Sequence, residues 1–183
     1  TLRVEVDGRL GSLTLDQPER RNAIGALALQ ELIDAAAWFD ASPASVVVVR
    51  GAGRAFCAGL DLNEAASGEG IGGGGSFADT LDLRNTPPTV LFEMDKPVIC
   101  ALNGSAAGYG MDLALGCDIR IMADNAKLAA AFVKRGVVPE SGGTWFLPRM
   151  LGWAKAAEII FTGRTLSAAD CLAERLVNQV VPA

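Results

Sequence analysis

Two turns of small residues, each following an apolar run, are the features of this sequence best suited to chemistry. CAGLDL (Cys57–Leu62) comes shortly after SVVVVRG, and GSAAGYGMDL (Gly104–Leu113) comes directly after KPVICALN. Small residues at the end of a strand leave backbone N–H groups accessible to a ligand. If the two turns converge, they offer two donors to one oxygen, as in an oxyanion hole that stabilises an enolate. Tight turns that serve only close packing are the alternative explanation.

Two carboxylates lie in settings that suit a general base. Asp112 lies within the apolar context GYGMDLALG, and Glu140 lies in GVVPESGGT, where no basic residue is closer than Arg135. Burial should raise the pKa of such a carboxyl towards the neutral range, where a base works best. The alternatives are a helix-start acid favoured by the helix dipole for Asp112, and a solvated loop acid for Glu140.

Several other chemistries are excluded by what the sequence lacks. It contains no histidine, which removes Ser-His-Asp, Cys-His and histidine-ligated zinc mechanisms together. GAGRAF (Gly51–Phe56) lacks the third glycine and the long helix of a dinucleotide fingerprint, and no phosphate loop of the GxxxxGK[ST] kind is present. The cysteines form no CxxC pair, so we expect no metal site or disulfide framework, only buried free thiols in a reducing compartment: Cys57, Cys100, Cys117 and Cys171.

Composition indicates one domain, spanning residues 1–183. Half of the 183 residues are hydrophobic, which is enough for one sizeable core and too little chain for two full domains. The net charge is −5 and no basic run occurs, so neither nucleic acid nor an anionic membrane is an expected partner. The charge-free stretch between Pro97 and Met111 contains polar residues and glycines and does not resemble a membrane span, and no signal peptide is recognisable.

The first third of the chain predicts a ββαβ order. VEVDGRLGSLTLD (residues 4–16) alternates apolar and polar residues around Asp7-Gly8, which predicts a hairpin with a type I′ turn. ALALQELIDAAAWFD (residues 26–40) has helical spacing. SVVVVRG (residues 45–51) predicts a strand covered on both faces, because its valines suit a pleated surface. The glycine-rich segment ASGEGIGGGGSF (residues 66–77) predicts a mobile loop that could act as a lid.

The rest of the chain continues the alternation, so we expect a largely parallel, twisted sheet with helical layers, an α/β fold. A helix break is expected near Pro148 and Gly152, and Ser167 with Asp170 resembles a capping box at the start of the last helix. The expected strands are KPVICALNG (96–104), RIMAD (120–124) and NQVVP (178–182), and the expected helices are MDLALGCDI (111–119), TWFLPRMLGWAKAAEIIFTG (144–163) and SAADCLAERLV (167–177).

Taken together, three segments closely resemble the crotonase superfamily, also called the enoyl-CoA hydratase/isomerase family. They are GAGRAFCAGLDL, KPVICALNGSAAGYGMDLALGCDIRIMAD, and the long stretch from GVVPESGGT to LVNQVV. The resemblance runs in order over nearly the whole chain. It implies a spiral of repeated ββα units, acyl-CoA thioester substrates, an oxyanion hole, and no cofactor beyond the coenzyme A of the substrate. It further implies a cytoplasmic homotrimer or dimer of trimers. Family members continue for several helices beyond the segment that matches NQVVP, so we expect a C-terminal part that is disordered, absent or truncated.

The resemblance assigns residues to the site one by one. Leu60, which follows CAG, matches the first oxyanion N–H donor, and Tyr109 matches the second, where many members have glycine. The tyrosine ring could narrow the acyl pocket or supply a hydroxyl. The positions that match the coenzyme A-binding segments are Arg21, Ala23, Ala58, Asp61 and Leu62.

The acids at the matched positions favour an isomerase over a hydratase. A hydratase of this family uses two glutamates to position water; the first corresponds to Asp112 and the second to Phe132, which cannot bind or deprotonate water. Glu140 lies where isomerases of the family carry an acid. One base can move a proton between C2 and C4 of an enolised thioester. The alternatives are a hydratase that uses Asp112 with another partner, and a non-catalytic acyl-CoA-binding protein.

Overall fold

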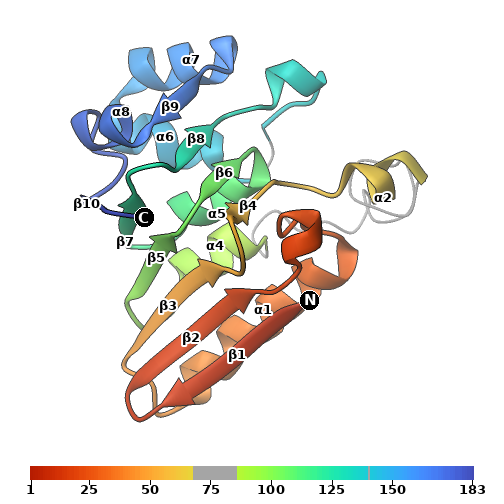
Figure 1. The fold of residues 1–183 in the computed structure, drawn as a ribbon, viewed down its shortest axis with the longest axis vertical. Helices are drawn as coiled ribbons and strands as arrows, with labels where there is room; N and C mark the ends of the chain where they lie inside the picture. The colour runs from red at the N-terminus through yellow and green to blue at the C-terminus, as the bar shows by residue number, and fades with distance from the viewer. Residues whose placement is uncertain (68–85, 140) are drawn as a thin grey trace.

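The structure is a computed structural model (Figure 1), and it describes residues 1–67, 86–139 and 141–183. Its first third has the predicted ββαβ order. The elements are β1 (Leu2–Asp7), β2 (Leu10–Leu15), a short 3-10 helix η1 (Pro18–Arg20), α1 (Ala26–Ala41) and β3 (Val46–Gly51). The predicted mobile loop begins within α2 (Leu62–Ser67), and its remaining residues lie outside the described part of the chain.

The hairpin is confirmed, but its turn differs from the expected type. Asp7 pairs with Leu10, so the two loop residues are Gly8 and Arg9. Only Gly8 has a positive φ, of 57°, whereas Arg9 is not among the residues with positive φ. A positive φ at the first loop position alone is the pattern of a type II′ turn; type I′ needs it at both positions.

Strand β3 is buried less evenly than the run of valines suggests. Val47 and Val49 are fully buried, while Val46 and Val48 are only partly covered. The prediction of a strand covered on both faces is therefore wrong for this strand. One side of the sheet packs against the core, and the other side is only half covered.

The strands form two sheets rather than one. The larger sheet has the order β1-β2-β3-β5-β7-β10, in which only β1 and β2 pair antiparallel. The smaller sheet has the order β4-β6-β8-β9. The further strands are β4 (Ala55–Cys57), β5 (Val98–Leu102), β6 (Ser105–Ala107), β7 (Ile119–Ala123), β8 (Lys127–Ala129), β9 (Thr165–Ser167) and β10 (Gln179–Val181).

Three successive strand pairs build both sheets together. β3 and β4, then β5 and β6, then β7 and β8 each give one strand to the larger sheet and the next to the smaller. Helical segments follow each pair, so the chain advances as a spiral of ββα units (Figure 1). These segments are α2 and α4 (Pro87–Phe92) after β4, α5 (Tyr109–Leu115) after β6, and η3 (Val133–Arg135), α6 (Gly143–Leu151) and α7 (Trp153–Thr162) after β8; α8 (Ala168–Ala173) follows β9.

The helix ends follow local chemistry. The expected helix break near Pro148 and Gly152 is confirmed: Pro148 lies inside α6, which continues to Leu151, and the break is at Gly152, where φ is 77°. The capping box at the start of α8 is confirmed, since Ser167 Oγ accepts the Asp170 N–H at 3.1 Å and the Asp170 carboxylate accepts the Ser167 N–H at 2.9 Å. This helix ends at Ala173, earlier than predicted, because Arg175 has a φ of 61°.

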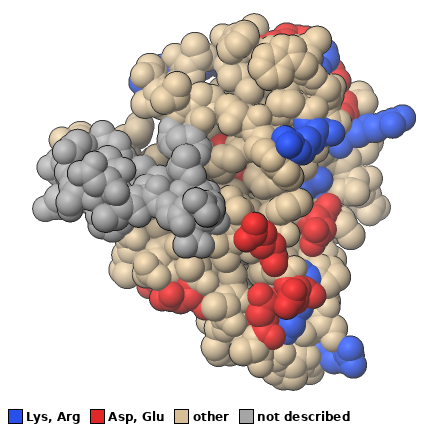
Figure 2. Space-filling model, turned by 180° about the vertical axis from the view of Figure 1, so that it is seen from behind, with Lys and Arg blue, Asp and Glu red and all other residues tan. Residues whose placement is uncertain are grey.

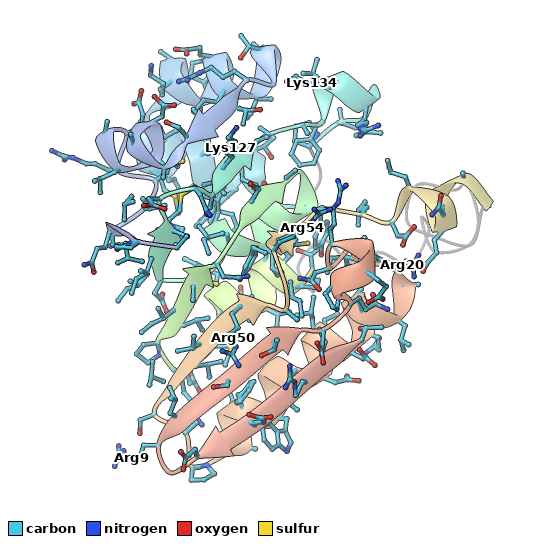
Figure 3. The ribbon with its side chains drawn as sticks, in the orientation of Figure 1. Arg9, Arg20, Arg50, Arg54, Lys127 and Lys134 are labelled. Atoms are coloured by element: carbon cyan, nitrogen blue, oxygen red, sulfur yellow. The ribbon has the colours of Figure 1, made fainter. Side chains whose placement is uncertain are left out.

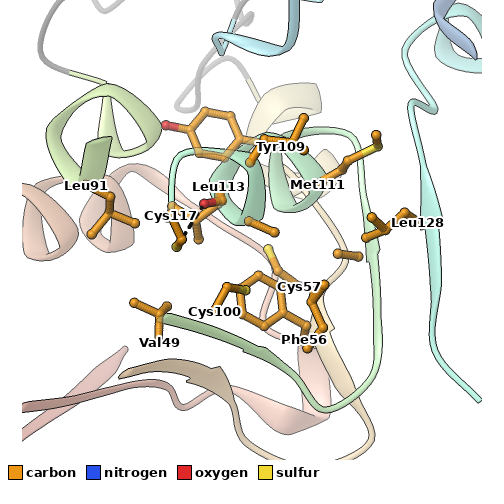
Figure 4. Close-up of a cluster of buried hydrophobic side chains, with 14 of the residues drawn as sticks. Val49, Phe56, Cys57, Leu91, Cys100, Tyr109, Met111, Leu113, Cys117 and Leu128 are labelled. Carbon is orange, nitrogen blue, oxygen red and sulfur yellow. Dashed lines mark hydrogen bonds between the residues drawn. The ribbon is translucent and has the colours of Figure 1, made fainter. Parts of the chain in front are cut away.

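The core is formed by both sheets and the buried faces of the helices, from α1, α4 and α5 to α6, α7 and α8. Figure 4 shows part of it, in which Cys57, Cys100 and Cys117 pack among Val49, Phe56 and Leu113. All four cysteines are free and buried, as predicted. The Arg120 guanidinium is also buried, and it donates to the carbonyls of Ala114 and Cys117 at the end of α5 and to that of Leu176.

On the described part of the face seen in Figure 2, uncharged residues predominate, and acidic and basic side chains occur in small clusters. Within residues 1–67, 86–139 and 141–183, no helix is long and apolar enough to cross a membrane. Over the same residues, no cluster of three or more Cys, Asp or Glu side chains could hold a metal ion.

Candidate active site

The first turn is fixed by a parallel bridge between Ile24 and Leu60. The Ile24 N–H donates to the carbonyl of Gly59 at 2.8 Å, and the Asp61 N–H donates to the carbonyl of Ile24 at 2.9 Å. Because the residues on both sides of Leu60 bond to Ile24, the N–H of Leu60 itself faces the opposite side of the segment. This is the orientation that a donor to a ligand requires.

The second turn lies against the first. Gly59 has a φ of 99°, and a Cβ added to it would lie 2.7 Å from the Ala107 carbonyl oxygen and 3.6 Å from the Tyr109 nitrogen. Gly108, with a φ of 52°, then leads directly into α5, whose first residue is Tyr109. The structure therefore brings together the two turns that the sequence singled out, with Leu60 and Tyr109 on their adjoining segments.

Helix α5 can approach this closely because Gly110 has no side chain. A Cβ added there would lie 2.4 Å from the Cys57 carbonyl oxygen and 2.8 Å from its Sγ. The Tyr109 ring is buried and points towards α4, which carries Leu91 (Figure 4). The ring thus fills space beside the second turn that a glycine at this position would leave open.

Asp112 is buried in the first turn of α5, with only 1% of its surface exposed. Its Oδ2 accepts the hydroxyl of Ser141 at 2.7 Å. Its Oδ1 lies 2.4 Å from where a Cβ of Gly143 would be, so the carboxylate packs against the first residue of α6. The Asp112 side chain therefore lies between the first turn of α5 and the N-terminal end of α6.

Phe132 and Glu140 are the two other positions on which the predicted reaction depends, and the structure describes only Phe132. Phe132 is buried, and its Cε1 lies 3.9 Å from the position of a Cβ on Gly108. An apolar ring therefore borders the second turn, where the resemblance places the second glutamate of a hydratase. Glu140 lies outside the described residues, and its role remains a prediction.

The two predicted coenzyme A-binding segments lie side by side. The Ala58 N–H donates to the Arg21 carbonyl at 3.0 Å, and Ala23 lies between Arg21 and the bridge formed by Ile24. Leu62, at the start of α2, is exposed. These contacts place the backbone of both segments in one strip next to the Leu60 turn.

The side chain of Asp61 holds this strip together. It is buried and ion-paired with Arg20, which is labelled in Figure 3, and its Oδ1 accepts the Asn63 N–H at 2.9 Å. Arg20 also lies 3.8 Å from Glu64, whose carboxylate accepts the N–H of Ala26 at the start of α1. Asp61 therefore acts on the site through the backbone it anchors.

Sequence reasoning missed three residues that shape the site: Arg20, Asn22 and Ser141. Asn22 is buried with a φ of 55°, and its amide donates to the carbonyls of Ala52, Ala55 and Phe56 around β4. The signal for Asn22 was its type, since asparagine tolerates a positive φ. The signal for Ser141 was a hydroxyl next to Glu140 and two glycines.

The fold is that of the crotonase superfamily, as comparison with solved structures shows. An enoyl-CoA hydratase from Bacillus anthracis superposes with a TM-score of 0.88 at 32% identity, over 99% of this chain and 70% of that one. An enoyl-CoA hydratase from Polaromonas sp. gives 0.88 at 34% identity, over 100% and 71%.

Sequence comparison then gives the family. The family model described as enoyl-CoA hydratase/isomerase matches residues 5–183. A Mycobacterium bovis protein named probable enoyl-CoA hydratase is 39% identical over 186 residues, covering 100% of this chain and 69% of its own length. A carnitinyl-CoA dehydratase of Proteus mirabilis is 39% identical over 188 residues, with the same coverage. The chain belongs to the enoyl-CoA hydratase/isomerase family, whose enzymes act on acyl-CoA thioesters.

Proposed function

We propose that this enzyme shifts a double bond in an enoyl-CoA thioester, converting a 3-enoyl-CoA into the conjugated 2-enoyl-CoA. The observation that carries the proposal is the buried Phe132 ring beside the second turn. Hydration needs two polar groups to hold and deprotonate water, and an aromatic ring supplies neither. A proton shift needs one base and a stabilised enolate, which the remaining residues can provide.

The reaction begins with enolisation of the thioester. The N–H groups of Leu60 and Tyr109 would bind the thioester oxygen, whose negative charge grows as the C2 proton leaves. The positive end of α5, which begins at Tyr109, adds to this stabilisation. The closeness of Gly59 to the Tyr109 nitrogen supports the pairing of these two donors.

Glu140 would accept the proton from C2 and return it to C4 of the dienolate. The double bond moves from C3–C4 to C2–C3, and no atom is gained or lost overall. Asp112 would assist by orienting Glu140 or the substrate from the start of α6, where its carboxylate is buried. The strip formed by Arg21, Ala23 and Ala58 would bind the coenzyme A part of the substrate, with Asp61 and Leu62 next to it.

A hydratase remains the second candidate, favoured by the names of the relatives. The Mycobacterium bovis and Bacillus anthracis proteins are named enoyl-CoA hydratases, and the Proteus mirabilis protein is a dehydratase. In this case Asp112 would position water together with a group other than Phe132. A non-catalytic acyl-CoA-binding protein is a third alternative.

Substitution of the proposed base separates these candidates. We expect Glu140→Gln to reduce isomerase turnover by roughly 100-fold or more, because the amide cannot accept the proton. Affinity for a saturated acyl-CoA, measured by calorimetry, should change little. Glu5→Gln on the exposed face of β1 is the matched control and should leave both quantities unchanged. Undiminished turnover in Glu140→Gln would contradict the assigned base, and a wild-type protein that binds without turnover would indicate the third alternative.

A further inference from the structure

A buried hydrogen bond joins α5 to the segment that precedes α6. The Ser141 hydroxyl donates to Asp112 Oδ2 at 2.7 Å, and each residue has only 1% of its surface exposed. A buried carboxylate needs such donors, since burial removes the water that would otherwise solvate it. The two residues are 29 positions apart in the sequence, so the bond fixes one segment relative to the other.

Two glycines, Gly142 and Gly143, shape the backbone that packs against the Asp112 carboxylate. Gly142 has a φ of 107°, which directs the chain from Ser141 into α6. Gly143 follows, and any side chain there would collide with Asp112, because its Cβ would lie 2.4 Å from Oδ1 and 2.9 Å from Cγ. Ser141 therefore donates a hydrogen bond to one carboxylate oxygen, and the absence of a side chain at Gly143 leaves room for the other.

We propose that Ser141 is a positioning residue that orients the Asp112 carboxylate for the proton transfer. This inference rests on the proposed function. The terminal torsion of an aspartate side chain has a broad intrinsic preference, and the hydrogen bond from Ser141 narrows it for Asp112. Ser141 also directly follows Glu140 in the sequence, so the bond ties the chain next to the proposed base to the helix that starts with the Tyr109 donor.

The test measures kcat and KM of purified Ser141→Ala and Ser141→Thr with a 3-enoyl-CoA. We expect Ser141→Ala to lower kcat by about tenfold or more with KM within about twofold, because the change affects orientation and not binding. Ser141→Thr keeps the hydroxyl and should recover most of the loss. Ser42→Ala is the matched control, since the Ser42 hydroxyl donates to the Phe39 carbonyl at the same distance of 2.7 Å, at the end of α1.

A double substitution distinguishes positioning from a structural role. If Ser141 acts through Asp112, Ser141→Ala should cause no further loss of kcat in an Asp112→Asn background. An equal fold-loss in both backgrounds, or an unchanged kcat in Ser141→Ala of an active enzyme, would overturn the positioning role alone. A wild-type protein inactive on the 3-enoyl-CoA would overturn the proposed isomerase function, and Ser141→Ala would then be measured on hydration by the same criteria. Absence of both activities would overturn both proposals.

Discussion

The thiol of Cys57 shows how strongly individual residues near the site are shielded from water. Cys57 ends β4, directly before the Ala58–Leu60 turn, and it is fully buried. Burial raises its pKa to about 12, an effect only partly offset by a hydrogen bond with the backbone of Gly59. Burial raises the pKa of Cys171 to about 12 as well. These thiols are therefore neutral in the folded protein at any physiological pH.

This shielding predicts that stability falls in alkaline solution. An unfolded cysteine ionises near pH 8.5, so above that pH the unfolded state binds fewer protons than the folded state, and the free energy of unfolding decreases as pH rises. For each fully shielded thiol the loss should be about 1 kcal/mol per pH unit above pH 8.5. Urea unfolding between pH 7 and 9.5 measures it, and Cys57→Ala should give a shallower decline. A free energy that stays constant to pH 9.5 would contradict the shielding.

At the scale of residues, the sequence located the two turns that the structure brings together. The turns around Leu60 and Tyr109 could be located because small residues directly follow an apolar run in both, a pattern that tight packing alone also explains. The partner of Asp112 could not, because the hydrogen bond from Ser141 depends on how α5 and α6 pack. The same holds for Asn22, whose three carbonyl partners lie 30 to 34 residues away along the chain.

At the scale of elements, the contact between α5 and β4 sets the geometry of both turns. Gly110 lies where the helix meets Cys57, at a distance that leaves no room for a methyl group. This contact fixes where α5 begins, and hence where the Tyr109 nitrogen lies relative to Gly59. A shift of the helix would therefore move the Tyr109 N–H relative to the Leu60 N–H, the other proposed donor.

We therefore expect Gly110→Ala to damage both stability and turnover. The added Cβ would lie 2.4 Å from the Cys57 carbonyl oxygen, so the helix must move away from the strand. Overpacking of this kind typically costs about 1–3 kcal/mol, which urea unfolding would detect. Gly136→Ala is the comparison, because no atom of the described residues lies within 4 Å of its added Cβ, whereas its φ of 67° causes strain. Full turnover in Gly110→Ala would show that the donors do not depend on this contact.

The elements that the sequence missed are mostly the short strands of the smaller sheet. β4, β6, β8 and β9 have three residues each, which is too few for a period-2 pattern to be recognised. The capping box at Ser167 was predictable because it depends on two side chains three residues apart. The helix break was predictable too, but not which of the two residues causes it, because Pro148 is accommodated inside α6 while Gly152 ends it.

At the scale of the whole molecule, large aromatic side chains of α6 and α7 are exposed on the surface. Trp153 and Phe161 are 76% and 72% exposed, and Trp145 of α6 is 43% exposed beside Phe92. Large aromatic side chains that are exposed close together often mark a surface that binds another protein. The predicted homotrimer would cover such residues.

Association is therefore expected in solution. Sedimentation velocity at micromolar concentrations should show a species larger than one chain, because the monomer leaves Trp153 and Phe161 in water. Trp153→Glu should shift the distribution towards monomer, whereas Glu5→Gln on β1 should not. A wild-type protein that stays monomeric at tens of micromolar would contradict the prediction.

The most direct test of the account compares two substrates by the absorbance of the conjugated enoyl thioester. With a 3-enoyl-CoA, the proposed isomerase should produce a rise in absorbance as the double bond moves into conjugation. With a trans-2-enoyl-CoA, the buried Phe132 predicts almost no fall, because no second polar group positions water. A rise in the first experiment with a flat trace in the second would support the isomerase. A rapid fall with the trans-2-enoyl-CoA and no rise with the 3-enoyl-CoA would contradict it and identify a hydratase.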